Sequence, residues 1–294
     1  MRPTALVTGI EGFTGPYMAA ELARLGYDVH GLSRSGASCS NRSSVDLLDR
    51  DGLGEVIQRV CPDVVVHLAG ISHVAHRDVS AIYQANIVGT RNLLDALTDL
   101  PKSPSKVLVA SSAHVYGSSS EVPFDERSPM HPFNDYAVSK VAAEHVANLY
   151  TDRLPVVITR PFNYTGVGQS SAFFVPKIVD HAKRGERRLR LGNLDVERDF
   201  TDVRDLAHAY GSLLRSDVAS GVYNVCSGRS SNLRSVIDTI GELAGVEFEI
   251  ESDAEFIRSN EVSRLAGNNA RLLAATSGMT FRPLRETLEW MLGA

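Results

Sequence analysis

The sequence predicts an α/β fold in which a doubly wound parallel sheet is followed by a smaller C-terminal α/β lobe. Three observations support this prediction. Short apolar segments alternate with helical ones up to about residue 160, a glycine-rich turn joins the first apolar segment to the first helical one, and the alternation loosens after Pro161. Such alternation is typical of parallel strands joined by right-handed helical crossovers.

The alternating segments place the elements of the first domain. Strands are expected at 5–8, 28–33, 64–68, 106–110 and 155–159, and helices near 14–25, 51–60, 78–98 and 134–150. Residues 1–160 therefore form one predicted domain, whose ligands would bind beyond the carboxyl ends of the strands.

The remainder, residues 161–294, is expected to form mainly a lobe that covers the mouth of the first domain. Its helices are predicted near 173–184, 203–216, 231–244 and 283–292, mixed with short strands. Two of the strand segments, 195–202 and 219–226, are candidates to return to the main sheet, and the pattern leaves this open.

Composition argues against several classes of function. The chain of 294 residues is 43 % hydrophobic and 22 % charged, which is ordinary for a globular protein, and its net charge of −5 offers no basic surface for nucleic acid. No apolar run approaches membrane-spanning length, and the chain enters a strand at once, without room for a signal peptide. Cys39, Cys61 and Cys226 have no metal spacing. We therefore expect a cytoplasmic protein with reduced thiols, no metal, and no membrane or nucleic-acid partner.

The glycine-rich turn predicts a dinucleotide site. Residues 9–15 read GIEGFTG, directly after the first strand and before the first helix. Glycines allow a tight turn and a close approach of backbone to a pyrophosphate, while the helix N-terminus offers free N–H groups and a positive dipole end. This is the signature of a Rossmann-type domain. The expected cofactor contacts here are Thr8, Gly9, Gly12, Phe13, Thr14 and Gly15.

The end of the second strand favours NADP(H) and makes NAD(H) the lesser choice. An acidic residue at that end would hold a ribose hydroxyl of NAD, but Asp28 lies at the strand's start and Ser33-Arg34 occupies its end. A guanidinium suits the 2′-phosphate of NADP; a solvated loop arginine is the other interpretation of Arg34. Asp46 and Leu47 are candidates at the adenine edge, although Asp46 is equally consistent with a helix N-cap.

Tyr136 and Lys140 lie four residues apart in a predicted helix, so both side chains share one face of it. A phenol has a pKa of about 10 in water, and a neighbouring ammonium favours the phenolate and lowers that pKa. The pair is suited to moving a proton on or off an alcohol or carbonyl oxygen near neutral pH. Alone it also occurs on many surface helices, so its weight comes from the glycine turn upstream.

Further motifs, in order along the chain, complete a resemblance to a known family. They are HLAG at 67–70, SSAHVYG at 111–117, the Tyr136/Lys140 pair and RPFN at 160–163. The chain resembles the extended short-chain dehydrogenase/reductase family, and within it the sugar-nucleotide branch. Residues 160–169 and 192–205 are similar to enzymes that act on GDP-sugars, the GDP-mannose 4,6-dehydratases and the 4-keto reductases. Near 258–272, Ser259 and Asn268 replace the family's proline and aspartate.

The resemblance implies NADPH-dependent reduction of the 4-keto group of a nucleotide-linked 6-deoxyhexose. The favoured substrate is GDP-4-keto-6-deoxymannose, giving GDP-rhamnose or its 4-epimer. The 4,6-dehydratases carry a carboxylate two positions after the catalytic Ser or Thr, whereas here Ser112 is followed by Ala113 and His114. The dehydratase is therefore disfavoured, and an epimerase of the same branch and a cofactor-sensing binding protein without turnover remain rivals.

The resemblance also assigns roles. Tyr136 would protonate the developing alkoxide, Lys140 would hold the nicotinamide ribose, and Ser112, with Ser111 as a competitor, would hydrogen-bond the carbonyl oxygen. The backbone of Leu68, Ala69 and Gly70 would lie close to the cofactor's ribose and diphosphate. His114 would contact substrate or fill the wall, and Lys177 would contact the base or stay solvated. The full set of implied substrate contacts is Ser72, Ser112, His114, Asn163, Val175, Lys177, Arg198, Arg258 and Glu261. A homodimer through the helices near 78–98 and 134–150 is also implied.

Overall fold

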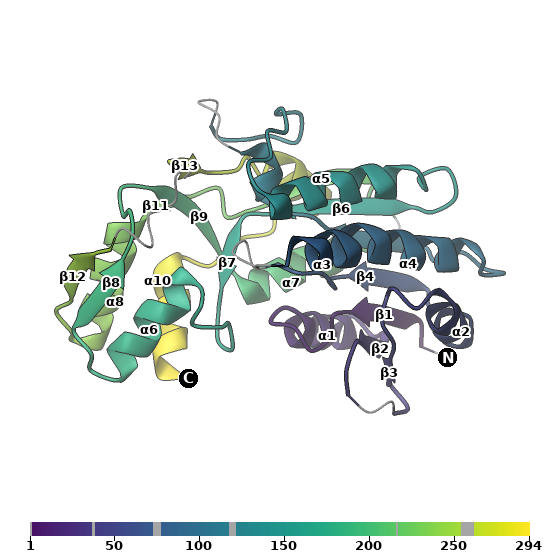
Figure 1. Cartoon of the computed structure of the whole chain (residues 1–294), viewed down its shortest axis with the longest axis horizontal. Coiled ribbons are helices and arrows are strands. Elements are labelled where there is room, and N and C mark those ends of the chain that lie inside the picture. Colours follow the sequence, from purple (N-terminus) through teal and green to yellow (C-terminus); the bar gives the residue numbers. More distant parts are fainter. Residues whose placement is uncertain (1, 37–38, 73–77, 118–121, 216, 254–261) are drawn as a thin grey trace.

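A computed structural model describes the whole chain except residues 1, 37–38, 73–77, 118–121, 216 and 254–261. Its centre is a seven-stranded sheet in the order β10-β6-β5-β4-β1-β2-β3, with every neighbouring pair parallel (Figure 1). The strands are β1 (Thr4–Thr8), β2 (Asp28–Ser33), β3 (Arg42–Ser44), β4 (Val64–His67), β5 (Lys106–Ala110), β6 (Val156–Pro161) and β10 (Gly221–Val225). The predicted doubly wound α/β fold is confirmed.

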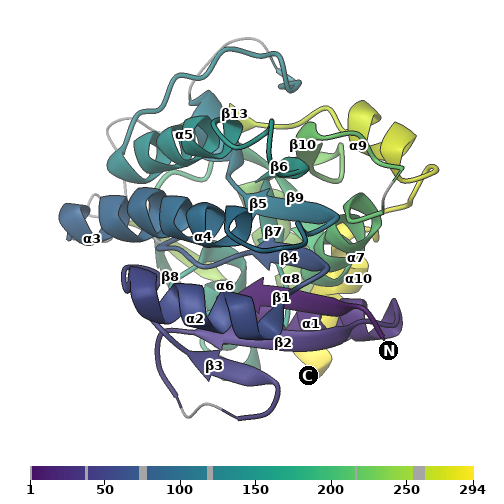
Figure 2. The same ribbon diagram turned by 90° about the vertical axis from the view of Figure 1, so that its right-hand side faces the viewer.

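Helices cover both faces of this sheet (Figures 1 and 2). On one face lie α2 (Arg50–Val60), α4 (Gly89–Thr98) and α5 (Asp135–Asn148), and on the other lie α1 (Gly15–Arg24) and α7 (Val203–Leu213). Alternate residues of β1 divide between the two cores: Leu6 packs with α2 and α4, whereas Ala5 and Val7 pack with α1 and α7. Because both faces are dry, the middle residues of the central strands are mostly apolar, and polar residues such as Lys106 and His67 stand at strand ends.

The predicted helix near 78–98 is not one regular helix. It consists of α3 (Val79–Tyr83), a π-helical turn η1 (Gln84–Val88) and α4. The sequence QANIV at 84–88 has no proline or glycine to mark the change of pitch. The short strand β3 was also not predicted, since Arg-Ser-Ser shows neither β-branched residues nor alternation.

After β6 the chain contributes to both parts of the molecule. The candidate segment 219–226 contains β10, which pairs with β6 at the edge of the main sheet. The other candidate, 195–202, was wrong: β9 (Glu197–Asp202) pairs with β7 (Asn163–Thr165), β11 (Ser230–Asn232) and β13 (Arg264–Leu265) in a separate sheet. Both aspartates of its sequence ERDFTD are buried in that separate sheet, where pairing supplies donors: Asp199 accepts from Ser227 N and Gly228 N, and Asp202 caps α7. The domain boundary near residue 160 stays a prediction.

The smaller lobe has its own core. Helices α6 (Phe174–Lys183), α8 (Leu233–Ala244) and α10 (Leu284–Gly293) pack around Ile178, Ile240 and Leu288, beside the pair of strands β8 (Arg188–Leu191) and β12 (Glu249–Ser252). Helix α9 (Ala270–Ala275) instead contacts β10. Across the described part of the chain, no helix combines the length and apolarity that crossing a membrane requires.

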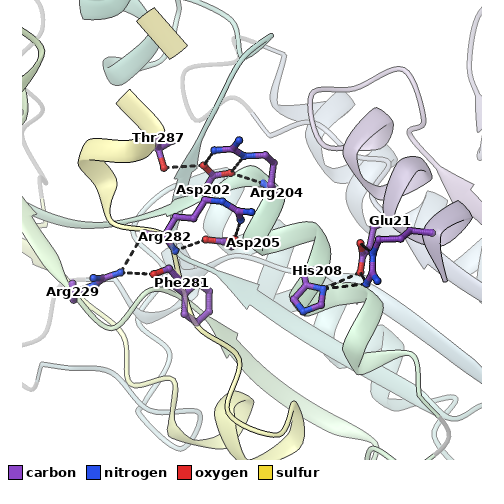
Figure 3. Close-up of polar contacts among 10 residues, drawn as sticks. Glu21, Asp202, Arg204, Asp205, His208, Arg229, Phe281, Arg282 and Thr287 are labelled. Atoms are coloured by element: carbon purple, nitrogen blue, oxygen red, sulfur yellow. Dashed lines mark hydrogen bonds and ion pairs between the residues drawn. The ribbon is translucent and has the colours of Figure 1, made fainter. Parts of the chain in front are cut away.

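Two buried carboxylates at the start of α7 hold the C-terminal segment in place (Figure 3). Asp202, the N-cap of α7, accepts two hydrogen bonds from the Arg204 guanidinium and one of 2.8 Å from Thr287 Oγ1 in α10. Asp205 accepts from the backbone N–H and the guanidinium of Arg282. The lobe that covers the sheet is therefore tied to a helix of the sheet domain.

Removing the charge of Asp205 tests this tie. Asp205→Asn should lower the free energy of unfolding by about 1.5–3 kcal/mol, because hydrogen bonds to a charged, buried acceptor are lost. The measurement is urea unfolding, with an unchanged slope and a lower midpoint. The matched control is Glu242→Gln, which breaks an exposed ion pair with Arg285 and should leave the midpoint unchanged. Equal midpoints for wild type and Asp205→Asn would contradict the prediction.

Candidate active site

One cleft of about 820 Å³ collects most of the residues that the sequence singled out. It runs along the carboxyl ends of β1, β4, β5 and β6 and continues under α6 of the smaller lobe. The predicted residues that line it are Gly9, Gly12, Phe13, Thr14, Gly15, Arg34, Asp46, Leu47, Leu68, Ala69, Gly70, Ser72, Ser112, His114, Tyr136, Lys140, Asn163, Val175, Lys177 and Arg198. Arg258 and Glu261 lie outside the described residues.

The glycine turn requires glycine at two of its positions. Gly9 has φ +70°, and a Cβ there would lie 2.8 Å from Ala69 N; at Gly15 a Cβ would lie 2.1 Å from Ile10 O. Helix α1 begins at Gly15, so its first N–H groups face the turn. A glycine turn before a helix N-terminus is a backbone arrangement suited to a dinucleotide pyrophosphate.

Thr8 does not line the cleft but supports it from below. Its Oγ1 accepts from Ala69 N at 3.1 Å and lies 2.7 Å from His67 Nδ1, and His67 Nε2 lies 3.0 Å from Thr90 Oγ1. Because Thr90 Oγ1 donates to Asn86 O, it accepts from His67, which fixes the Nε2–H tautomer. Burial lowers the pKa of His67 to about 3, so this ring stays neutral.

Asn86 of the π-helical turn holds the loop after β4. Its Oδ1 accepts from Ile71 N at 2.8 Å, and its Nδ2 donates to Ile71 O and to Ser139 Oγ in α5. A Cβ on Gly70 would lie 2.7 Å from the same Oδ1. The backbone that lines the cleft at residues 69–71 is thus joined to the helix that carries Tyr136.

The adenine edge contains Arg34, which is exposed at the end of β2, beside Asp46 and Leu47. Asp46 Oδ1 accepts from Leu48 N in a turn, and the N-cap of α2 is Asp49. The helix N-cap interpretation of Asp46 was therefore wrong by three positions. Sequence reasoning also missed Glu11, which lines the cleft and pairs with Arg42 at 3.1 Å.

Ser112, Tyr136 and Lys140 meet at the floor of the cleft. Asn134 caps α5 and starts the helix just before Tyr136, while Ser112 caps the 3₁₀ turn η2 (Ala113–Tyr116). A hydrogen bond joins Ser112 to Tyr136, and Lys140 Nζ donates to Ala110 O at 2.8 Å. Ser111 also lines the cleft, but its hydroxyl donates to Glu144 Oε1 at 2.5 Å. Of the two candidate serines, Ser112 is the one hydrogen-bonded to the phenol.

Burial dominates the protonation of this group. It raises the pKa of Tyr136 to about 12, against the lowering effect of the Ser112 hydrogen bond, and it lowers the pKa of Lys140 to about 8. The expectation that Lys140 lowers the pKa of Tyr136 was therefore wrong for this structure. The physical reason is that both groups are dry and that the ammonium donates to a carbonyl.

The substrate half of the cleft is polar at a few points only. Asn163 Oδ1 is buried without a hydrogen-bond partner, which leaves an acceptor for a ligand. His114 packs edge-on against Tyr136, with ring centroids 5.9 Å apart. Arg198 Nη1 donates to Glu197 O, and Lys177 Nζ donates to Arg190 O at 2.8 Å. Lys177 therefore lines the cleft, as a contact to the base would require, but its ammonium is bound to a backbone carbonyl.

Tyr164, an aromatic residue that the sequence analysis did not single out, also lines the cleft. Phe13 stacks on Tyr164 with ring centroids 5.8 Å apart, and Tyr164 Oη lies 3.0 Å from Thr14 Oγ1. Tyr164 lies inside the RPFNYTGVGQ motif, one position after Asn163, so the motif itself was the available signal. Ser72 is exposed at the rim and Val175 is buried beneath it. Among the described residues no His, Cys, Asp or Glu cluster could hold a metal ion.

Comparisons with known proteins agree with this geometry. The GDP-6-deoxy-D-mannose reductase of Pseudomonas aeruginosa is 36 % identical over 99 % of this chain and 97 % of its own length. The GDP-6-deoxy-D-talose 4-dehydrogenase of Aggregatibacter actinomycetemcomitans is 29 % identical over 97 % and 96 %. In structure, a candidate epimerase from Burkholderia cenocepacia superposes with TM-score 0.93 at 46 % identity, over 100 % of this chain and 98 % of that one.

A second solved structure contains a cofactor. RMD from Pseudomonas aeruginosa, complexed with NADPH, superposes with TM-score 0.83 at 36 % identity, over 99 % of this chain and 98 % of that one. The sequence profile of the family described as GDP-mannose 4,6 dehydratase matches residues 6–283. The resemblance drawn from the motifs is therefore confirmed, and the chain belongs to the GDP-mannose 4,6-dehydratase family of NAD(P)-dependent extended short-chain dehydrogenases/reductases.

Proposed function

We propose that this protein reduces the 4-keto group of a GDP-linked 6-deoxyhexose with NADPH. The observation that carries the proposal is the floor of the cleft: Tyr136 is hydrogen-bonded to Ser112, and Lys140 lies one helical turn away. The same cleft reaches from the glycine turn to α6. It can therefore hold a dinucleotide and a second nucleotide with their reactive ends at one tyrosine.

The protonation of Tyr136 suits reduction. With a pKa of about 12 the phenol is fully protonated at neutral pH and can give its proton to a developing alkoxide. NADPH, when bound, supplies the hydride. Ser112 would donate a hydrogen bond to the ketone oxygen, and Lys140 would hold the nicotinamide ribose. A reductase uses Tyr136 as an acid, which is the form that burial favours.

The residues after Ser112 argue against dehydration. Elimination of water needs a base at a carbon-bound proton, and Ala113, which is buried, cannot supply one. His114 packs on Tyr136 in place of a carboxylate. An epimerase is the second candidate, because a structural neighbour is described as a candidate epimerase. An epimerase consumes no NADPH, whereas a reductase consumes one equivalent per turnover.

The substrate half of the proposal rests on Asn163 and Arg198. The unpartnered amide oxygen of Asn163 and the fork-shaped guanidinium of Arg198 would bind the sugar and its diphosphate. The two relatives named above act on GDP-6-deoxy-D-mannose and GDP-6-deoxy-D-talose, which differ at the carbon that would be reduced. The face of the ketone that is presented to the hydride would decide between these products.

We also propose a cytoplasmic homodimer, formed by α3 and α5 of two copies. Val79 on α3, Val138 on α5 and Leu149 at the end of α5 are exposed large hydrophobic residues on neighbouring helices. Two such helices from each copy would form a four-helix contact and bury these side chains.

The first experiment mixes the protein with NADPH and freshly made GDP-4-keto-6-deoxymannose. Stoichiometric loss of NADPH absorbance with a GDP-6-deoxyhexose product is expected. Tyr136→Phe should lower kcat on the order of 10²- to 10⁴-fold, because the proton donor is lost. The control Tyr27→Phe changes a phenol outside the cleft and should keep wild-type kcat. If Tyr136→Phe folds and keeps near-full turnover, the proposed mechanism is wrong. If the wild-type protein consumes no NADPH, the epimerase is favoured.

Cofactor choice is tested at Arg34. Arg34→Ala should lower the preference for NADPH over NADH, as a ratio of kcat/KM, on the order of 10- to 100-fold, because the charged partner of the 2′-phosphate is removed. Arg215→Ala, an exposed arginine paired with Asp217 outside the cleft, is the matched control and should keep the wild-type ratio. The prediction fails if Arg34→Ala also keeps that ratio.

Sedimentation velocity tests the dimer. Wild type is expected to sediment as a dimer, and Val138→Arg as a monomer, because a charge at the centre of an apolar contact is costly to bury. Leu25→Arg places the same charge at an equally exposed position at the end of α1 and should remain dimeric. A monomeric wild type would refute the proposed interface.

A further inference from the structure

A buried ion pair lies directly behind the catalytic residues. Glu144 is one helical turn after Lys140 in α5, and Arg160 is in β6; their side chains are 4 % and 5 % exposed. Two hydrogen bonds join them, Arg160 Nη2 to Glu144 Oε2 at 2.7 Å and Arg160 Nε to Glu144 Oε1 at 2.9 Å. Desolvation makes such a pair a poor source of stability compared with apolar packing, so its presence calls for another explanation.

The carboxylate is bonded to the strand end that holds both catalytic groups. Glu144 Oε1 accepts from Ser111 Oγ at 2.5 Å. Ser111 stands between Ala110, whose carbonyl accepts from Lys140 Nζ, and Ser112, which is hydrogen-bonded to Tyr136. Glu144 thus ties the end of β5 to α5 at the residue between the two contacts that position the site.

Arg160 anchors the carboxylate from the other side. Its Nη1 donates to Tyr116 Oη at 3.0 Å and to Glu126 O at 3.2 Å, and Tyr116 Oη donates to Asn224 Oδ1 at 2.6 Å. The guanidinium also lies over the Tyr116 ring, 5.0 Å from its centroid. Since Asn224 belongs to β10, the ion pair is anchored to two strands, β6 through Arg160 itself and β10 through Tyr116.

Few charged groups surround Lys140, and Glu144 is the acidic residue whose charge raises the pKa of Lys140. On its own helix the other ionisable residues are Asp135, Tyr136, Glu144 and His145. The ionisable residues on the elements packed against this helix are Arg160 of β6, His114 and Tyr116 of η2, Tyr83 of α3, which donates to Asp135, and Arg91 and Asp95 of α4, of which Asp95 accepts from Tyr150. The π-helical turn supplies none, and His67 of β4 is neutral.

We infer that Glu144 is a positioning residue for the catalytic centre: through Ser111 it holds the end of β5 in register with α5, and its charge sustains the buried Lys140 ammonium. That the centre is catalytic rests on the proposed function, whereas the contacts of Glu144 do not depend on it. Glu144 does not line the cleft, so it acts through Ser111 and Lys140 and never touches a ligand.

The sign of the electrostatic effect follows from the surroundings. Burial lowers the pKa of Lys140, and the charge of Glu144 raises it against that effect. Glu144→Gln removes the anion that raises it, so the pKa of Lys140 should fall further. Activity that needs the ammonium should then be lost at a lower pH than in wild type.

The titration of Lys140 can be measured without any substrate. The chain has five lysines, Lys102, Lys106, Lys140, Lys177 and Lys183, so ¹³C-lysine labelling gives a spectrum in which Lys140 is assigned with Lys140→Met. Glu144→Gln is expected to move the Lys140 midpoint to lower pH. The control Glu242→Gln removes an equally charged carboxylate from an exposed ion pair in α8 and should leave the midpoint at its wild-type value.

Steady-state kinetics of Ser111→Ala test the positioning role of Glu144. They do so even if Glu144→Gln does not fold. Ser111→Ala keeps the ion pair and removes only one hydroxyl, so it should fold like wild type. Its kcat is expected to fall on the order of 10-fold with little change in the KM for NADPH, because misplaced groups slow the chemical step more than binding. The alkaline limb of its pH profile should stay in place, whereas that of Glu144→Gln should move to lower pH.

Two results would overturn the inference. One is a folded Glu144→Gln whose Lys140 midpoint equals that of wild type, and the other is wild-type kcat in Ser111→Ala. A purely structural role predicts a lower unfolding midpoint in Glu144→Gln with an unmoved Lys140 titration. If Lys140 shifts as expected while no GDP-ketosugar is reduced, the proposed function fails and the positioning role of Glu144 stands.

Discussion

Parallel pairing of strands inside a sheet that is buried on both faces is the constraint on which the rest of this molecule depends. Parallel strands all end at the same edge, and a dry interior forces polar side chains out to that edge. Thr8, His67, Ser111 and Asn163 each stand at or just past the end of a different strand. Thr8 and His67 hydrogen-bond one another beneath the cleft, and Ser111 donates to Glu144 in α5.

The order of the strands decides which ends meet. β1 lies between β2 and β4, so the glycine turn faces the adenine edge on one side and the loop after β4 on the other. β5 and β6 continue the row, which brings Ser112 next to α5 and Asn163 next to the smaller lobe. A long cleft with the catalytic tyrosine near its middle is a consequence of this order, and it needs no dedicated loop.

The sequence predicted most of this arrangement because local patterns determine it. Four-residue spacing placed Tyr136 and Lys140 on one helix face, and alternation located the strands that end at the cleft. What failed depended on tertiary surroundings. The pKa of Tyr136 depends on burial, the sheet to which β9 belongs depends on which neighbours can accept its charges, and the pitch change at 84–88 depends on packing against α5. None of these leaves a local pattern.

The π-helical turn has a consequence for insertions and deletions in this chain. A π turn is one residue wider than an α turn, so deleting a single residue within Gln84–Val88 would restore regular pitch. Because the wide turn absorbs the extra residue, that deletion would leave α3 and α4 close to their present phase, but it would change the backbone position from which Asn86 contacts Ile71 and Ser139. The scaffold would accept such a length change more readily than the cleft would.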